Sequence, residues 1–385
     1  MSPRATIPGA DTDQVGGPPY GPPDVVDALL GIEDGTPLAA LRALRPEVRA
    51  HTQGSYDALF DPAVSTGVTP EERFATALRV AALHAHEPLA DHFRSRLAGA
   101  APGGAAAADV EAGRTDALPA RTAAMLVHAE LLALRPAAAT PDDHERLRAA
   151  GLDTAQIVTV SQLVSFVSFQ ARVLTGLALL AGVDRGVPGG SAGQVPVPEF
   201  PFTLAEVGWE PWLPPLEMAD ATDEQRAALP GFRADMPYFR LLALDPAVLV
   251  ERTATDNGIF YTRGGAPRAD RELAATTASR LNGCVFCASV HSRFAAHFGK
   301  RTEDVQRLLD EGLGADLGDE RWNAVVNLAA KLSWTPSAAE PSDVARLRRA
   351  GLEDPEILDI VQATAFFAWA NRLMQTIGGP VPPPA

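Results

Sequence analysis

Apolar residues recur at helical spacing along most of the chain, and this pattern predicts helices rather than strands. Residues 155–181 and 355–374 place Leu, Val, Ile, Phe and Ala on successive turns. Another helix is expected from Thr69, which is a suitable N-cap, followed by Pro70 and by Glu72 at the third helical position. Alternating strand patterns joined by Asn-Gly or Asp-Gly turns are absent from the sequence. The predicted fold class is therefore all-α.

The helical pattern occurs twice, at an offset of 200 residues. ERLRAAGLDTAQI (145–157) corresponds to ARLRRAGLEDPEI (345–357), and LRALRPEV (41–48) corresponds to LLALDPAV (241–248). A constant register between such distant segments predicts two tandem copies of one helical unit. Arg372 recurs as Arg172 in the other copy, which favours a structural salt bridge over a catalytic role.

Composition places the boundaries of the two copies. Residues 1–23 are rich in Pro and Gly and predict a flexible tail, followed by a first helical domain over 24–181. Residues 182–236 begin as a Gly/Pro-rich linker, but Trp209 and Trp212 make the later part too apolar for a free tether. We expect this part to pack as an arm, and the second helical domain to occupy 237–385.

Charge and hydropathy restrict the possible partners. The formal net charge of −15 argues against nucleic acid and against an anionic membrane surface, because both are bound through clustered Lys and Arg. We find no 18-residue apolar run and expect no transmembrane helix. The N-terminus lacks the apolar segment of a signal peptide, so we expect a cytoplasmic protein whose thiols are kept reduced.

Both cysteines of the chain lie in LNGCVFCASVH (281–291). Gly283 predicts the end of one helix, and a new helix is expected to begin near Cys284. The first turn of a helix stabilises a thiolate, because its free N–H groups and dipole favour anions. Cys284 and Cys287 share a helix face, and His291 lies one turn beyond Cys287. An imidazole at this position can accept a thiol proton, and the dithiol can cycle through a disulfide.

Glu272 precedes Cys284 by twelve residues. If the two helices pack as a hairpin, its carboxylate can orient His291 and stabilise the imidazolium. An alternative is that the cysteines and His297 are ligands of a zinc ion. Ligands confined to one helix cannot surround a metal tetrahedrally, so we expect no metal. The sequence contains no haem, flavin or dinucleotide motif, and we expect no cofactor.

The spacing Glu272-x11-Cys284-x2-Cys287-x3-His291 resembles the alkylhydroperoxidase AhpD-like proteins of the carboxymuconolactone decarboxylase superfamily. The resemblance covers residues 236–380, and the first copy through the repeat. It implies an all-helical homo-oligomer in which Cys287 is peroxidatic, Cys284 resolves the sulfenic acid, His291 is the base and Glu272 completes the proton relay. It also implies an organic hydroperoxide substrate and a dihydrolipoyl or thioredoxin-like thiol reductant.

The first copy lacks this motif. Its equivalents of the two cysteines and the histidine are His84, Glu87 and Asp91, so thiol chemistry is confined to the second copy. We expect the first copy to be a scaffold. Two alternatives are a metal or acid–base cluster, formed by His84, His86, Glu87, Asp91 and His92, and a small-molecule pocket without chemistry.

The expected activity is that of a thiol-dependent peroxidase. The same dithiol is compatible with a disulfide reductase or isomerase, and with a non-catalytic redox sensor or scaffold. The name of the superfamily adds decarboxylase chemistry, which needs no dithiol. Turnover distinguishes an enzyme from a redox sensor, because an enzyme consumes many equivalents of peroxide per site whereas a sensor consumes one.

Overall fold

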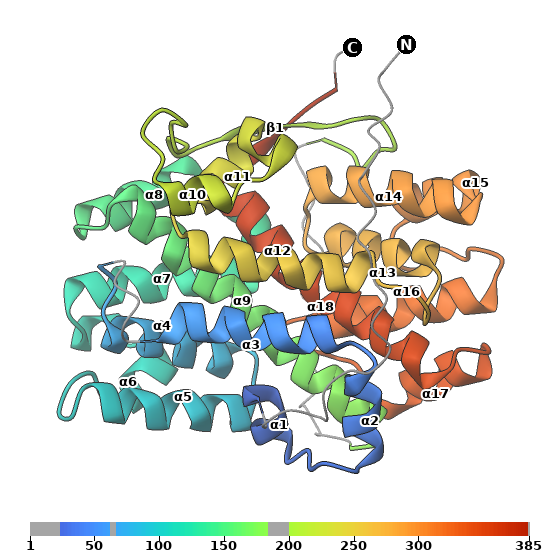
Figure 1. Cartoon of the computed structure of the whole chain (residues 1–385), viewed down its shortest axis with the longest axis horizontal. Coiled ribbons are helices and arrows are strands. Elements are labelled where there is room, and N and C mark those ends of the chain that lie inside the picture. The colour runs from blue at the N-terminus through green and yellow to red at the C-terminus, as the bar shows by residue number, and fades with distance from the viewer. Residues whose placement is uncertain (1–23, 62–66, 184–199, 384–385) are drawn as a thin grey trace.

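The computed structural model describes residues 24–61, 67–183 and 200–383. Over these residues the chain forms eighteen α-helices, three short 3-10 helices and a single pair of strands, so the all-α prediction is confirmed (Figure 1). The predicted tail (1–23) and most of the Gly/Pro-rich linker lie outside the described residues.

The elements follow one another in two similar series. The first comprises α1 (Val25–Leu30), α2 (Pro37–Ala43), α3 (Pro46–Phe60), α4 (Pro70–Leu83), α5 (Glu87–Ala100), α6 (Ala107–Ala112), η1 (Thr115–Ala117), α7 (Ala120–Leu134), η2 (Pro136–Ala138), α8 (Pro141–Ala149) and α9 (Thr154–Leu180). Between the series lie β1 (Gly208–Pro211), α10 (Asp223–Ala227) and η3 (Gly231–Asp235). The second comprises α11 (Pro237–Leu242), α12 (Pro246–Phe260), α13 (Arg268–Leu281), α14 (Val285–Gly299), α15 (Thr302–Glu311), α16 (Glu320–Ser333), α17 (Pro341–Arg349), α18 (Asp354–Thr376) and β2 (Gly378–Val381).

Helix starts recur at the offset of 200 residues seen in the sequence. The pairs α3 and α12, α7 and α16, α8 and α17, and α9 and α18 each begin at equivalent positions. Local signals explain this agreement, since Pro46, Pro141 and their counterparts occupy the first helical position. In Figure 1, α5 and α6 lie at the lower left and α14 and α15 at the upper right. The two series therefore face in opposite directions around a common centre.

Helices α9 and α18 pack against each other at that centre, and the surrounding helices cover them (Figure 1). A single apolar cluster contains side chains from both series, so the two halves share one core. The helices approach closely at Gly176, where a Cβ atom would lie 2.3 Å from Cγ1 of Val361. Glycine at this position permits the side chain of Val361 to pack directly on the backbone of α9.

The sequence analysis found no 18-residue apolar run and expected no transmembrane helix, but one helix has the length and composition of a membrane span. Thr154–Leu180 is long and apolar enough to cross a membrane by length and composition, and its most apolar stretch of 18 residues has a mean hydropathy of 1.7. Its most apolar stretch is 100% buried inside the protein, which is the position of a core helix in a soluble protein. Burial against α18 therefore accounts for its apolar character.

Arg172 and Arg372 link the two halves, but not through the predicted salt bridge. Arg172 donates from Nη2 to the carbonyl of Ser333 at 2.7 Å, and Arg372 donates from Nη2 to that of Ala133 at 2.8 Å. Both guanidinium groups also reach Thr335 Oγ1, at 2.8 and 3.5 Å. The acceptors are carbonyls at the C-terminal ends of α16 and α7, where the helix dipole stabilises a positive charge. The prediction of a salt bridge was wrong, because the acceptors of both arginines are backbone carbonyls at helix ends and not carboxylates.

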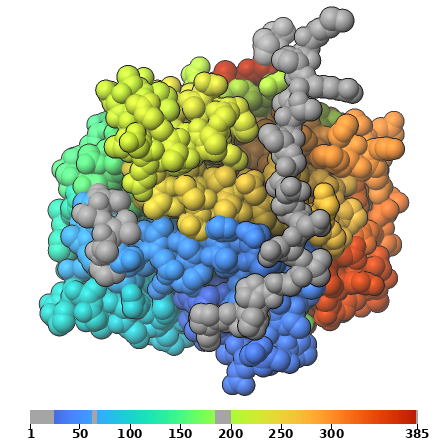
Figure 2. All heavy atoms as spheres, in the orientation of Figure 1, coloured from blue at the N-terminus to red at the C-terminus, as the bar shows by residue number. Residues whose placement is uncertain are grey.

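The arm (residues 200–236) packs on the rest of the molecule and covers the upper left of the face in Figure 2. β1 pairs antiparallel with β2 in the register Gly208↔Val381. Trp209 donates from Nε1 to the carbonyl of Met374 at 2.9 Å and contacts Tyr238 edge-on. The sequence analysis did not predict this strand pair, because the strands are short and about 170 residues apart, without a local turn signal.

The reciprocal arginine contacts predict a stability effect. Replacing Arg372 by Met keeps most of the side-chain volume but leaves the buried carbonyl of Ala133 without its donor. We expect the free energy of unfolding to fall by about 2 kcal/mol, measured by urea denaturation. The exposed Arg349→Gln serves as the control and should change stability by less than about 0.5 kcal/mol. Equal stability of Arg372→Met and Arg349→Gln would contradict a bridging role.

Candidate active site

The two cysteines lie where α13 ends and α14 begins. Asn282 caps α13, and Gly283 has a φ of 75°, a conformation that favours glycine. Cys284 is the N-cap residue of α14, and its N–H donates to the carbonyl of Ser279 at 2.9 Å. Cys287 lies in the first turn of α14. Both thiols are free, and both are buried.

Glu272 and His291 meet across the α13–α14 hairpin. His291 Nδ1 lies 2.5 Å from Oε2 of Glu272, whose side chain is fully buried. The other oxygen of this carboxylate, Oε1, accepts from Nε of Arg268 at 2.5 Å. The structure therefore brings Glu272, His291 and the dithiol together, and it adds Arg268 as a second partner of the carboxylate.

The surroundings of the two thiols shift their pKa values in opposite directions. Burial opposes ionisation of Cys287, but a hydrogen bond from Cys284 and the nearby charge of His291 outweigh it, so the pKa of Cys287 is lowered. Burial and the hydrogen bond with Cys287 raise the pKa of Cys284 well above its ordinary value. Burial also disfavours the imidazolium of His291, but Glu272 reverses this effect and raises the pKa. These directions favour the thiolate at Cys287 over Cys284 and favour the imidazolium form of His291.

Further residues reach the thiols from helices that the sequence analysis did not connect with them. Asn371 of α18 lies near both thiols, where its amide favours their ionised forms, and its side chain hydrogen-bonds Asn282 and Ser279 at the end of α13. Arg252 of α12 contributes a positive charge near Cys287 and donates to Tyr238 Oη at 3.2 Å. Burial raises the pKa of Tyr238 to about 12, so it remains a neutral phenol. A comparison of the two copies could have found these residues, since their equivalents are Ala171, Thr52 and Leu38.

His291 is the most accessible of the four motif residues. Its side chain is 19% exposed, whereas that of Glu272 is 0% exposed and Cys287 as a residue only 4%. The ring of Phe367 lies edge-on to His291 at 4.3 Å, and those of Phe260 and Phe294 lie 5.7 and 6.2 Å away. His291 is therefore partly exposed and is surrounded by aromatic rings.

The arm covers another side of α14. Phe202 and Val207 form a small apolar cluster with Val285 and Ala288, which flank Cys287. Ser289 donates from Oγ to the carbonyl of Ala205 at 2.6 Å. The arm thus shields the first turns of α14 from water, which explains part of the burial of the thiols.

The equivalent positions in the first half have other roles. His84 Nε2 lies 3.2 Å from Ser168 Oγ, and Asp91 pairs with Arg94. Glu72 forms the predicted capping box with Thr69 and pairs with Arg121 Nε at 2.8 Å. The carboxylate retained at this position therefore stabilises a helix end and does not orient a histidine.

The described residues of the two halves form no candidate metal site. Among the described residues, no group of three or more His, Cys, Asp and Glu side chains could hold a metal ion. The alternative cluster around His84 is not assembled, since His92 Nε2 instead lies 2.7 Å from Tyr56 Oη and His86 caps α5. Zinc held by the cysteines and His297 also finds no support within the described part of the chain.

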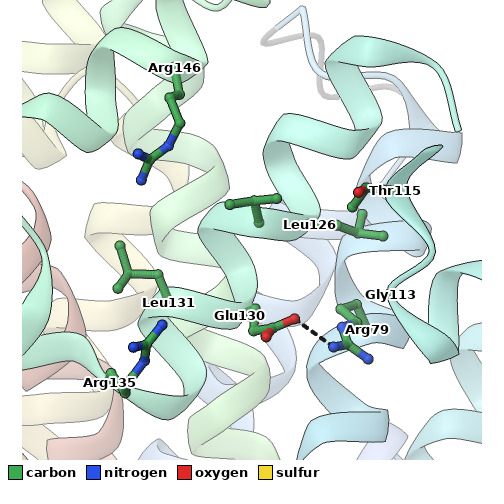
Figure 3. Close-up of a pocket in the computed structure, with 9 residues that line it drawn as sticks. Arg79, Gly113, Thr115, Leu126, Glu130, Leu131, Arg135 and Arg146 are labelled. Atoms are coloured by element: carbon green, nitrogen blue, oxygen red, sulfur yellow. Dashed lines mark hydrogen bonds and ion pairs between the residues drawn. The ribbon is translucent and has the colours of Figure 1, made fainter.

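A cavity of about 230 Å³ lies in the first half, away from the dithiol (Figure 3). Arg146 and Arg135 extend toward it from α8 and the end of α7, and Glu130 pairs with Arg79 on its other side. A second cavity, of about 350 Å³, occupies the equivalent place in the second half. Lining positions 113, 115, 126, 127, 130, 131 and 146 of the first recur 200 residues later in the second. The cavities are therefore a repeated feature of helix packing.

The structure thus combines an all-α fold with a Cys-x-x-Cys pair, a histidine and a buried glutamate. Residues 246–331 match the model of the carboxymuconolactone decarboxylase family. A solved structure described as an alkylhydroperoxidase AhpD core, an uncharacterized peroxidase-related protein from Ralstonia eutropha JMP134, is 24% identical. That match covers 41% of this chain and 85% of the other, with a TM-score of 0.36. No curated protein matches the chain. The resemblance to the superfamily is confirmed for the region that contains α12, α13, α14 and most of α16.

The charges of the site predict how the thiols respond to pH. Cys287 should react with iodoacetamide below the pH range of an ordinary cysteine, because its thiolate is favoured. Replacing His291 by Ala removes the stabilising cation, so the pKa of Cys287 should rise by about one unit. Alkylation at a pH below both pKa values then slows about tenfold. Mass spectrometry of the alkylated peptides measures the two thiols separately.

His297→Ala is the matched control for this experiment, since His297 lies on the same helix without a contact to the thiols. It should leave the alkylation profile unchanged. Equal profiles for wild type and His291→Ala would show that His291 does not stabilise the thiolate.

Proposed function

We propose that this protein is a thiol-dependent peroxidase that reduces organic hydroperoxides through a dithiol–disulfide cycle. The observation that supports this most directly is the position of the dithiol at a helix N-terminus beside the His291–Glu272 pair. The hydrogen bond of 2.5 Å to a buried carboxylate holds the imidazole in one orientation and favours its charged form. A thiolate with a low pKa and an adjacent acid are the two groups that peroxide reduction requires.

The first step is attack of the Cys287 thiolate on the terminal oxygen of the hydroperoxide. The S–O bond forms as the O–O bond breaks, and the imidazolium of His291 gives its proton to the departing alkoxide. Cys287 is thereby oxidised to a sulfenic acid and the hydroperoxide is reduced to an alcohol. Glu272 stabilises the imidazolium before this transfer.

The second step forms the disulfide. Cys284 loses its proton to the now neutral His291 and attacks the sulfur of the sulfenic acid. The S–S bond forms as the S–O bond breaks, and the hydroxide leaves as water after it takes the proton from His291. The net reaction converts the dithiol and the hydroperoxide into a disulfide, an alcohol and water, so both thiols supply electrons.

A dithiol partner returns the enzyme to its starting state. We propose that this partner is a dihydrolipoyl or thioredoxin-like protein, in a cytoplasm that keeps thiols reduced. We also propose that the two-domain chains assemble into a homo-oligomer. Exchange of the Cys284–Cys287 disulfide with such a dithiol completes the cycle without a bound cofactor. Disulfide reductase activity uses the same exchange and is the second candidate, because both thiols of the pair are free.

Thiol titration tests the proposal. Reduced wild-type protein should lose both thiols after one equivalent of cumene hydroperoxide. Cys284→Ser should accumulate a sulfenic acid at Cys287, detected by dimedone labelling, and Cys287→Ser should not react. Intact thiols in the wild type would contradict the peroxidase and leave disulfide exchange as the function to test. Consumption of many equivalents with dihydrolipoamide distinguishes an enzyme from a sensor, which stops after one.

A further inference from the structure

The cavity of the first half has a different lining from its counterpart in the second half, although both occupy equivalent places. Its wall contains Arg79 and Arg135 (Figure 3). The equivalent residues of the second half are Ser279 and Thr335, which carry no charge. Shared helix packing accounts for a cavity at this place, but it does not account for two arginines that occur in one copy only. These arginines therefore indicate a role that belongs to the first half.

The charges in the wall leave one arginine without a partner. Arg79 pairs with Glu130 at 2.6 Å, and Arg146 pairs with Asp143. Arg135 is the C-cap residue of α7, and its guanidinium has no hydrogen bond or ion pair among the described residues. Arg135 and Arg146 extend toward the same cavity in Figure 3. Because the guanidinium fork matches the two oxygens of a carboxylate, this part of the wall suits an anionic group.

Arg79 adds a donor that the protein does not use. Its Nη1 donates to the carbonyl of Glu111 at 2.5 Å, and its Nη2 donates to Glu130 at 2.6 Å. The Nε of Arg79 is buried and has no acceptor among the described residues. A buried N–H without an acceptor is unfavourable, since it has lost its contact with water. An oxygen of an anionic ligand in the cavity can supply the missing acceptor.

A smaller cavity of about 80 Å³ adjoins the first one. The two cavities share the lining residues Val127, Leu131 and Arg146. His128 lines the smaller cavity and is only 3% exposed. Its Nε2 lies 3.0 Å from Oγ of Ser161, and its Nδ1 has no partner in the described part of the chain. Each of the two adjoining cavities is therefore lined by a residue with a buried polar atom that lacks a partner.

The hydrogen bonds of Ser161 determine which nitrogen of His128 carries the proton. Ser161 Oγ donates its own proton to the carbonyl of Ile157 at 2.8 Å, so it accepts from Nε2 of His128. Nδ1 is consequently an acceptor. Burial lowers the pKa of His128 to about 3, which keeps the ring neutral. The group that meets Nδ1 must therefore be a donor, such as a hydroxyl.

The second half has neither of these features. Leu328 stands at the position of His128, and Val361 stands at that of Ser161. Lys331 lines the second cavity, but it forms a salt bridge of 2.9 Å with a carboxylate of α17. Among the described side chains that line this cavity, none has a buried polar atom without a partner. The unpaired atoms therefore belong to the first cavity and do not follow from the shared packing.

We propose that the first half binds a small organic anion in these two cavities, with its carboxylate on Arg135 and Arg146 and a hydroxyl group that donates to Nδ1 of His128. Arg79 Nε is a further donor to the same anion. The volume of about 230 Å³ exceeds the ~150 Å³ that accommodates benzene, so the ligand has about six carbon atoms or fewer. This binding does not involve the dithiol and is independent of the proposed peroxidase activity.

A pair of dicarboxylates that differ by one hydroxyl group tests the proposal. Isothermal titration calorimetry of the reduced full-length protein at low ionic strength compares malate with succinate. We expect the wild type to bind malate about tenfold more tightly, because only malate has a donor for Nδ1 of His128. His128→Leu introduces the residue of the second half and should remove this preference. Arg135→Thr, designed in the same way, should weaken the binding of both dicarboxylates at least about tenfold.

Arg346→Gln is the matched control. Arg346 lines the second cavity at the position equivalent to Arg146, so its replacement should leave both affinities unchanged. Phenylglyoxal modification of the wild type gives a measurement that needs no variant. Malate should protect Arg135 from this reagent but not the exposed Arg349, as quantified by mass spectrometry. Circular dichroism verifies that each variant is folded.

Each contrary outcome overturns a defined part of the proposal. If malate neither binds the folded wild type nor protects Arg135, the site does not exist. Equal affinities for malate and succinate, or inorganic phosphate that binds as tightly as malate, refute the contact between a hydroxyl group and His128. Binding that is unchanged in Arg135→Thr, or equally weakened in Arg346→Gln, places the anion elsewhere and overturns the site. None of these results depends on whether the protein consumes peroxide.

Discussion

The contact between α9 and α18 determines the arrangement of the whole molecule. These helices belong to different halves, and each is buried along almost its entire length. Gly176 allows them to approach, and Arg172 and Arg372 fix their relative position through carbonyls at helix ends in the opposite half. A buried guanidinium is costly to desolvate, so each arginine requires the other half to be in place. The shared core and the reciprocal contacts make folding of the halves interdependent.

The dithiol depends on the same central helix. Asn371 and Arg372 are neighbours on α18, but they have different partners. Asn371 hydrogen-bonds Asn282 and Ser279 at the end of α13, just before the dithiol, and Arg372 binds the end of α7. The helix that joins the halves therefore also positions the reacting atoms. This arrangement gives the first half a function without chemistry of its own, because its α9 and α7 hold α18 in place.

The sequence predicted the helical class and the motif well, because both depend on local signals. Helix starts follow proline and capping residues, and Glu272, Cys284, Cys287 and His291 lie within two consecutive helices. Two helices joined by a short turn leave few possible positions for residues on their facing sides, so such residues can be predicted to meet. The roles assigned to them in peroxide reduction stay predictions.

What the sequence analysis missed depends on contacts between distant segments. Asn371 follows Cys287 by 84 residues, and the strand pair joins positions about 170 residues apart. Arg172 and Arg372 suggested ion pairs because isolated charges are rarely buried, and only the fold shows that helix ends supply the acceptors.

The fate of the retained glutamate shows why identity between the copies does not establish equal function. Glu72 and Glu272 occupy equivalent positions, but Thr69 draws Glu72 into a capping box and Arg121 pairs with it. In the second half Arg268 binds one oxygen of Glu272 and leaves the other for His291. The same carboxylate thus stabilises a helix end in one half and an imidazolium in the other. The difference arises from its neighbours, so a site in a duplicated protein is defined by the residues that changed together.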